Sequence, residues 1–151
     1  MNGALPMTTS LPYLKHFDLS GQVALVTGSA RGLGLCIARA LAGSGARVLI
    51  NGRNAQAAEA AAAALRADGL DAHALAFDVS DDAAMAQAFD RIDRDHGRLD
   101  ILVNNVGARN RKTLADTSAA EIRELIDTDL VAGILLAKLA AERMVRQGGG
   151  R

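Results

Sequence analysis

Cysteine, aromatic residues and net charge are all scarce in this chain, and each scarcity excludes a class of protein. Cys36 is the single cysteine among 151 residues, so no disulfide can form within the sequence and a reducing compartment is expected. Aromatic residues make up 3% of the chain, which argues against a surface that stacks on nucleic-acid bases. Basic and acidic residues each total 17, so we expect neither nucleic acid nor an anionic membrane as a partner.

Long apolar runs are missing as well. The stretch "LVAGILLAKLAA" (130–141) is interrupted by Lys138 and is too short to cross a bilayer. The N-terminus has neither the basic start nor the apolar core of a secretion signal, and Pro6 and Pro12 interrupt it. We therefore expect a cytoplasmic protein with a loose arm over residues 1–16 and one domain over residues 17–151.

Strand-like and helix-like segments alternate through this domain. Four apolar runs have the length of buried strands, and a segment of helical periodicity follows each one. The strands are predicted at residues 22–28, 46–52, 72–79 and 99–105, and the helices at 32–44, 54–69, 81–97 and 119–146. Such alternation with short connections requires parallel strands. We predict an α/β fold with an open, doubly wound, Rossmann-like parallel sheet.

Local signals indicate where these helices begin and what they bury. Asn54 and Ser80 are candidate N-caps, and Ser118 forms a capping box with Glu121. Cys36 lies in the first helix, where we expect a small buried side chain rather than a nucleophile. The apolar residues that recur at helical spacing in the same helix are Leu33, Ile37 and Leu41.

Three glycines stand between the first strand and the first helix, in "TGSARGLG" (27–34). Gly28 permits a tight turn, Gly32 lets a phosphate approach the backbone, and Gly34 lets the helix pack closely on the strand. A helix that begins there directs its backbone N–H groups and its positive end toward one point, which suits a pyrophosphate. A glycine cluster alone is more often a set of turns, but its place inside a βαβ unit favours dinucleotide binding.

This spacing resembles the T-G-x-x-x-G-x-G fingerprint of the short-chain dehydrogenase/reductase family. "NNVG" (104–107) is similar to the family's N-N-A-G, and "DV" (78–79) stands where the family places an aspartate near the adenine. The resemblance runs from about Phe17 to Arg151 and implies the strand order 3-2-1-4, hydride transfer between a nicotinamide and a carbonyl or alcohol, and a homo-oligomer. Asn104 we interpret as a support of the sheet. The residues expected around the cofactor are Gly28, Ser29, Arg31, Gly32, Leu33, Gly34, Arg53, Asn54, Asp78, Val79, Asn105, Val106 and Gly107.

The end of the second strand indicates which nicotinamide cofactor is used. NAD enzymes place an acidic residue there to bind the ribose 2′-hydroxyl, but by alignment with the family Gly52 occupies that position and Arg53 follows it. A guanidinium attracts a 2′-phosphate, and Arg31 in the glycine loop supplies a second cation on the same side. We therefore predict NADP, with NAD as the alternative; two solvated surface arginines are the competing interpretation.

The segment "VNNVGARNRKTL" (103–114) is similar to the matching stretch of gluconate 5-dehydrogenases. Arg109, Arg111 and Lys112 in this loop could attract the carboxylate of a small sugar acid, or could simply be solvated. An enzyme similar to 3-oxoacyl-carrier-protein reductases is the alternative.

The family's hydride transfer uses an Asn, a Ser, a Tyr and a Lys. We predict no metal in this site. Asp129 stands where we align the Asn, so it is the candidate catalytic residue, binding a relay water through a carboxylate. Tyr13 is the single tyrosine and lies in the N-terminal arm, so it cannot be the catalytic one. We expect residues 17–151 to be the cofactor-binding half of a longer enzyme. A short dinucleotide-binding protein and a module that joins subunits through its last helix are the alternatives.

Overall fold

The computed structural model describes residues 12–151 of the chain. Residues 1–11 of the predicted arm lie outside the described residues, and Pro12–Phe17 forms a 3₁₀ helix, η1. A four-stranded parallel sheet follows, with the order β3-β2-β1-β4, which confirms the predicted fold and strand order. Its strands are β1 (Val23–Val26), β2 (Arg47–Ile50), β3 (Ala72–Ala74) and β4 (Ile101–Val103).

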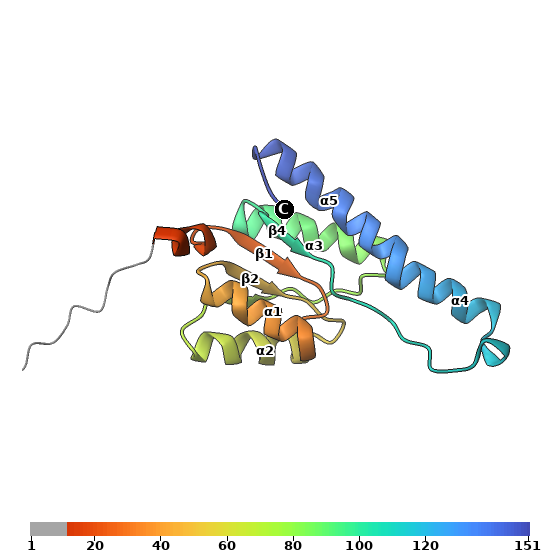
Figure 1. Cartoon of the computed structure of the whole chain (residues 1–151). Coiled ribbons are helices and arrows are strands. Elements are labelled where there is room, and N and C mark those ends of the chain that lie inside the picture. Colours follow the sequence, from red (N-terminus) through yellow and green to blue (C-terminus); the bar gives the residue numbers. More distant parts are fainter. Residues whose placement is uncertain (1–11) are drawn as a thin grey trace, which may run out of the picture.

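Helices connect the strands and cover both faces of the sheet (Figure 1). The helices are α1 (Gly32–Gly43), α2 (Ala55–Ala67), α3 (Asp82–His96), the 3₁₀ helix η2 (Leu114–Asp116), α4 (Ala119–Ile126), the π-helical turn η3 (Asp127–Val131) and α5 (Ala132–Arg146). Helices α1 and α2 lie on one face, and α3 and α5 lie on the other. In the part of the chain that the structure describes, no helix combines the length and the apolar composition needed to cross a bilayer.

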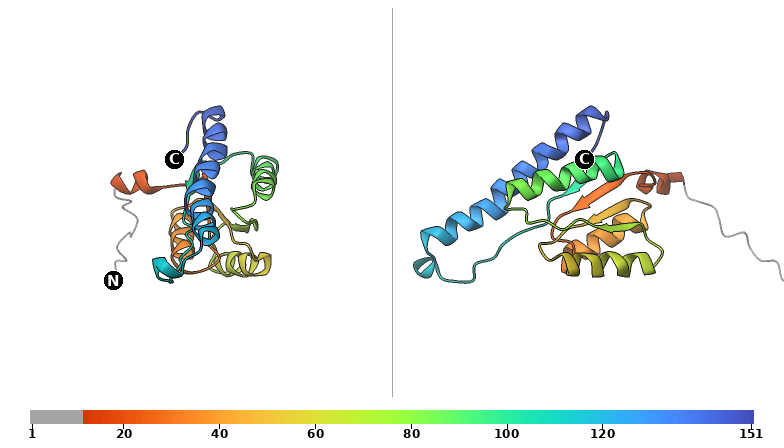
Figure 2. Two further views of the ribbon diagram at one scale, coloured as in Figure 1. Left: turned by 90° about the vertical axis from the view of Figure 1, so that its right-hand side faces the viewer. Right: turned by 180° about the vertical axis from the view of Figure 1, so that it is seen from behind.

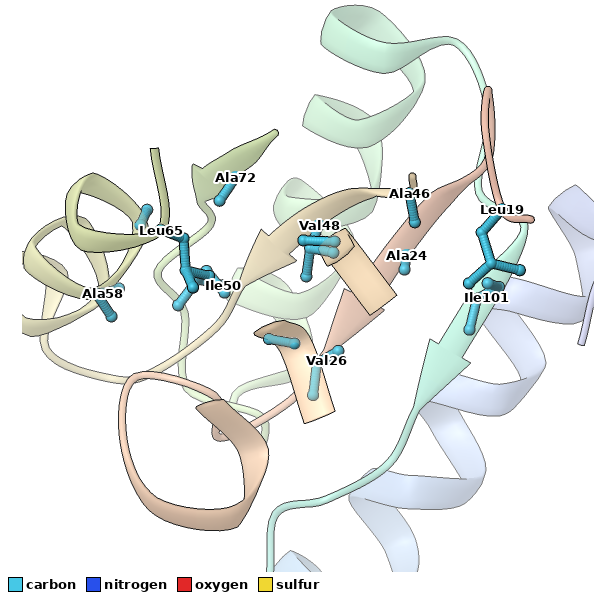
Figure 3. Packing of buried hydrophobic residues seen from close by; sticks show 14 residues of the cluster. Leu19, Ala24, Val26, Ala46, Val48, Ile50, Ala58, Leu65, Ala72 and Ile101 are labelled. Atoms are coloured by element: carbon cyan, nitrogen blue, oxygen red, sulfur yellow. The ribbon is translucent and has the colours of Figure 1, made fainter. Parts of the chain in front are cut away.

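Strand β1 lies at the centre and contributes to two hydrophobic cores. Ala24 and Val26 pack toward α1 and α2, whereas Val23 and Leu25 pack toward α3 and α5. All four residues are at most 3% exposed, because alternate side chains of a strand point to opposite faces and both faces are covered. The core beneath α1 and α2 consists largely of alanine together with valine, leucine and isoleucine, as the labelled residues in Figure 3 show.

The predicted apolar face of α1 is only partly the buried one, because Ile37 and Leu41 pack half-buried against the core whereas Leu33 does not. Its buried residues are Gly34, Ala38 and Ala42, while Leu33 is 72% exposed. Cys36 is exposed too, so the prediction that it is buried is wrong. Helix α1 lies so close to the sheet that only small side chains fit between them, and larger residues therefore occupy the flanks and the outer surface of the helix.

Two of the three predicted N-caps are confirmed. Asn54 accepts a hydrogen bond from the backbone of Ala57, and Ser118 forms its capping box with Glu121. The third prediction is wrong, because α3 is capped by Asp81, which accepts from Ala84 N at 2.9 Å. Ser80 instead directs its hydroxyl to the carboxylate of Asp78.

The α4–η3–α5 segment is one uninterrupted helical rod with two different environments. Helix α5 packs on α3, whereas α4 has no buried residue and extends beyond the end of the sheet (Figures 1 and 2). Arg143 fastens α5, because its guanidinium reaches both carboxylate oxygens of Asp93 and lies 4.9 Å from the centre of the Phe89 ring. At 9% exposure it is a nearly buried, charge-assisted contact between the two helices.

We predict that Arg143→Ala lowers the free energy of unfolding of the full-length protein by about 1–3 kcal/mol, because the charge-assisted bonds and the stacking on Phe89 are both lost. Arg146→Ala is the control, since Arg146 is exposed on the same helix. Urea unfolding of both variants is the measurement. Equal losses of unfolding free energy in the two variants would show that the Arg143–Asp93 pair stabilises the fold no more than an exposed arginine does.

Candidate functional site

A cleft of about 2250 Å³ opens at the carboxyl ends of the strands. It lies at the point where the chain, having built β2 and β3 on one side of β1, continues with β4 on the other side. Open α/β sheets bind ligands at such a switch point. The volume exceeds the roughly 300–1,000 Å³ of ordinary small-molecule pockets, so the cleft has room for an extended ligand.

Nearly all of the predicted site residues are brought together here. The cleft is lined by Gly28, Arg31, Gly32, Leu33, Gly34, Arg53, Asn54, Asp78, Val79, Asn105, Val106 and Gly107. Ser29 and Asp129 are absent from this lining. Residues from four separate segments thus meet around one concave surface, and those segments follow β1, β2, β3 and β4 in turn.

The three glycines of the loop serve different steric needs. Gly28 and Gly32 have φ values of +62° and +60°, which L side chains rarely adopt. A Cβ on Gly34 would lie 2.5 Å from the carbonyl oxygen of Gly28 and 2.6 Å from Nδ2 of Asn105, so no side chain fits there. At Gly32 a Cβ would meet nothing within 4 Å, because that position faces the cleft.

The start of α1 is open to an anion. Arg31 is the N-cap residue, and its side chain makes no capping hydrogen bond. The first-turn N–H groups of a helix have no partner within the helix itself. Together with the helix dipole they make this end of α1 suitable for a phosphate group.

Thr27 and Asn105 join the glycine loop to the loop after β4. The fully buried Thr27 accepts hydrogen bonds at Oγ1 from the backbone N–H groups of Asn105 and Val106, at 2.9 and 3.2 Å. The Asn105 amide donates to the carbonyl oxygens of Thr27 and Gly28, at 2.9 and 3.3 Å. Asn104 donates to the carbonyl of Gly133, so it supports the helical rod rather than the sheet.

Ser29 has a supporting position rather than a lining one. It is fully buried, its hydroxyl donates to the carbonyl of Val26 at 2.6 Å, and the same oxygen accepts from the backbone N–H of Asn51. The side chain therefore holds the loop against β2, and a contact between Ser29 and the cofactor stays a prediction. The predicted site did not include Asn51, although a polar residue directly after the apolar run "RVLI" was a usable signal.

Charged residues meet where the segments after β2 and β3 adjoin. Arg53 is exposed, and its guanidinium lies 4.0 Å from the carboxylate of Asp78. Burial raises the pKa of Asp78, but the hydrogen bonds from Ser80 and the charge of Arg53 outweigh burial, so the net pKa is lowered. Asp78 is therefore ionised at neutral pH, and its carboxylate lies beside the exposed guanidinium of Arg53.

Asp129 lies in the π-helical turn and acts as a tether. Its Oδ1 accepts a hydrogen bond from the backbone N–H of Ala108, which directly follows "NNVG", at 2.6 Å. The structure thus directs this carboxylate to the loop after β4 and leaves it out of the cleft lining. Its role in binding a relay water stays a prediction. π-turns are rare and occur frequently at functional sites.

The loop after β4 contains three basic residues, of which one is paired with a glutamate and two line the cleft. Lys112 donates to Glu121 at 2.6 Å, and this bond, with those from Ser118, lowers the pKa of Glu121 to about 2. Arg109 and Arg111 line the cleft instead. Arg123 of α4 lines it as well, a residue that no sequence motif marks.

Comparisons with known proteins agree with this geometry. Residues 22–151 match the family model described as short chain dehydrogenase. Gluconate 5-dehydrogenase of Gluconobacter oxydans is 40% identical over 135 residues, which are 89% of this chain and 53% of that protein. D-threitol dehydrogenase of Mycolicibacterium smegmatis is 38% identical, over 89% of this chain and 52% of that protein.

Among solved structures, a gluconate 5-dehydrogenase from Burkholderia cenocepacia in complex with NADP and tartrate superimposes with a TM-score of 0.86 at 37% identity. The match covers 91% of this chain and 54% of that one. The chain spans about half the length of the curated relatives it matches.

We predict that Gly34→Ala lowers the melting temperature more than Gly32→Ala does. The added methyl group at Gly34 would overlap a backbone carbonyl, so α1 must move and Asn105 must give up its bonds. At Gly32 the cost is limited to the positive φ, about 1–2 kcal/mol. Thermal unfolding of the two variants measures the difference, and the reverse order would contradict the close approach described for Gly34.

Proposed function

Because the chain belongs to the short chain dehydrogenase family, we propose that the full-length protein is an NADP-dependent oxidoreductase that acts on a small sugar acid. The observation that carries this proposal is the cleft at the switch point, where "TGSARGLG" and "NNVG" are hydrogen-bonded to each other through Thr27 and Asn105. A bound nicotinamide would supply the hydride acceptor or donor. The residues described here bind and orient it.

The residues of the cleft fit a dinucleotide. The open start of α1 suits a pyrophosphate, and Gly32 leaves room for it because nothing lies where a side chain would be. Asp78 and Val79 line the adenine end, and Asn105, Val106 and Gly107 follow the cofactor toward the nicotinamide. These contacts are assigned by resemblance to the short chain dehydrogenase family, and all of these residues line the one cleft.

The preference for NADP rests on charge. Arg53 and Arg31 both line the cleft, and Gly52 brings no carboxylate that would repel a 2′-phosphate. A side chain at Gly52 would also lie 3.2 Å from Cβ of Ala30, which is tight. The B. cenocepacia relative was solved with NADP, which supports the same preference.

The class of substrate rests on the arginines at the other end of the cleft. Arg109 and Arg111 approach from the loop after β4, and Arg123 approaches from α4. Lys112 is paired with Glu121, so the attraction for a carboxylate falls to the arginines. Relatives named for gluconate support an acidic sugar.

We also propose that the full-length protein is a homo-oligomer. The rod formed by α4, η3 and α5 exposes apolar side chains about one turn apart, at Ile122, Ile126, Leu130 and Ile134. In the full-length protein, a second copy of the same rod packed along this stripe would cover those side chains that the rest of the chain leaves exposed.

Arg53→Ala tests the cofactor preference. Loss of a charge-assisted phosphate contact costs roughly 1.5–3 kcal/mol, so the dissociation constant for NADPH should rise about tenfold or more while that for NADH changes little. Arg39→Ala is the control, because Arg39 is an exposed arginine of α1 that pairs with Asp68 and does not line the cleft. Equal losses for both cofactors would contradict the assignment of Arg53.

Arg111→Ala tests the substrate class. If this guanidinium receives a carboxylate, the KM for gluconate or its 5-keto form should rise about tenfold or more, and the KM for a neutral polyol such as threitol should stay within twofold. Steady-state kinetics with NADP(H) and the full-length protein supply both values. Parallel increases for the acid and the polyol would remove Arg111 from substrate recognition.

A further inference from the structure

We infer that Asn51 is the positioning residue of the cofactor's adenosine end, and that it acts through the three backbone segments that it joins. Asn51 is part of the cleft lining. Asn51 follows β2 directly and is 1% exposed. This inference rests on the proposed cofactor function. What it adds is the side chain that holds the glycine loop, the turn after β2 and the segment after β3 in one fixed arrangement.

The amide of Asn51 is shared among these segments. Its Oδ1 accepts from the backbone N–H of Gly28 at 3.1 Å. Its Nδ2 donates to the carbonyl oxygens of Leu75 and Phe77, at 3.2 and 3.1 Å. Both N–H groups are thus used within the protein, so the amide has no donor left to offer to a ligand.

The backbone of Asn51 reinforces the same connection. Its carbonyl accepts from the N–H of Ser29 at 2.8 Å, and its own N–H donates to the Ser29 hydroxyl at 2.9 Å. Ser29 and Gly28 are therefore both attached to this one residue. Main-chain and side-chain atoms of Asn51 act on the glycine loop together.

The segment after β3 needs such a partner. The pairing of β2 with β3 ends at Ile50 and Ala74, and the N–H of Leu75 makes the last ladder bond, to the carbonyl of Ile50. Leu75 and Phe77 are buried, and a buried carbonyl left without a partner costs about 1–3 kcal/mol. The Asn51 amide takes the place of a longer strand, and it does so directly before Asp78 and Val79.

Three walls of the cleft therefore depend on one side chain. The glycine loop faces the pyrophosphate, Arg53 faces the 2′-phosphate, and Asp78 and Val79 face the adenine in the proposed complex. If Asn51 sets their spacing, its removal weakens binding of the adenosine half specifically. A residue that only stabilises the fold would lower the melting temperature and leave binding below that temperature intact.

The experiment compares Asn51→Ala with Asp100→Ala in the full-length protein. Asp100 is 6% exposed and accepts from the backbone N–H of Val23 at 2.8 Å, at the opposite end of the strands, so it is a matched loss of a buried polar support. The probes are 2′,5′-ADP and NADPH, titrated at a temperature below both melting transitions. Hydrogen exchange of residues 28–34 and 75–79 is followed in parallel.

We expect Asn51→Ala to raise the dissociation constants of 2′,5′-ADP and NADPH by the same factor, tenfold or more, and to speed exchange in both segments together. Asp100→Ala should lower the melting temperature while both constants stay within twofold. Unchanged binding in Asn51→Ala, or equal weakening in both variants, overturns the inference.

If Asn51→Ala does not fold, Asn51→Asp replaces it. This variant keeps the size of the side chain and the acceptor for Gly28 but sets an oxygen against the carbonyls of Leu75 and Phe77. The same loss of 2′,5′-ADP binding is expected, and unchanged binding overturns the inference. A wild-type protein that binds neither probe would instead defeat the proposed cofactor function, while the exchange experiment would still decide whether Asn51 couples the two segments.

Discussion

The absence of a side chain at Gly34 is the constraint on which the cleft depends. A Cβ at this position would overlap both the carbonyl of Gly28 and the amide of Asn105. Because it is missing, the first turn of α1, the end of β1 and the loop after β4 meet in direct contact. The buried hydroxyl of Thr27 then joins the two loops. Sterics and hydrogen bonding at this one point give the switch point its shape.

Charge is distributed along the cleft in a way that the neutral composition hides. Arg31 and Arg53 come from the segments after β1 and β2, whereas Arg109 and Arg111 come from the loop after β4 and Arg123 from α4. Carboxylates moderate the charge locally, since Asp78 lies beside Arg53 and Glu121 holds Lys112. A chain with zero formal net charge therefore presents five arginines along one concave surface.

The sequence predicts the architecture well, because apolar runs, helical periodicity and the glycine spacing are local signals. It predicts contacts between segments less well. Their apolar character predicts that Leu33 and Cys36 are buried. The buried residues of α1 are instead the small ones, because the helix lies close to the sheet. Asp81 rather than Ser80 caps α3, because the Ser80 hydroxyl donates to the carboxylate of Asp78. Asn51 and Arg123 belong to no motif, and only the three-dimensional arrangement reveals their surroundings.

The pairing of β1 with β4 has a consequence for the order of folding. Val26 and Val103 are register partners although 76 other residues separate them in the chain. By contrast, β1 pairs with β2, and β2 pairs with β3, across much shorter stretches of sequence. Closing a long loop carries an entropic cost before any contact repays it. The unit formed by β1, β2 and β3 can therefore assemble first, while the Thr27 hydroxyl still lacks its partners in the loop after β4. The cleft is completed only when β4 pairs with β1. The segments after β1, β2 and β3 are therefore in place before the loop after β4 closes the cleft.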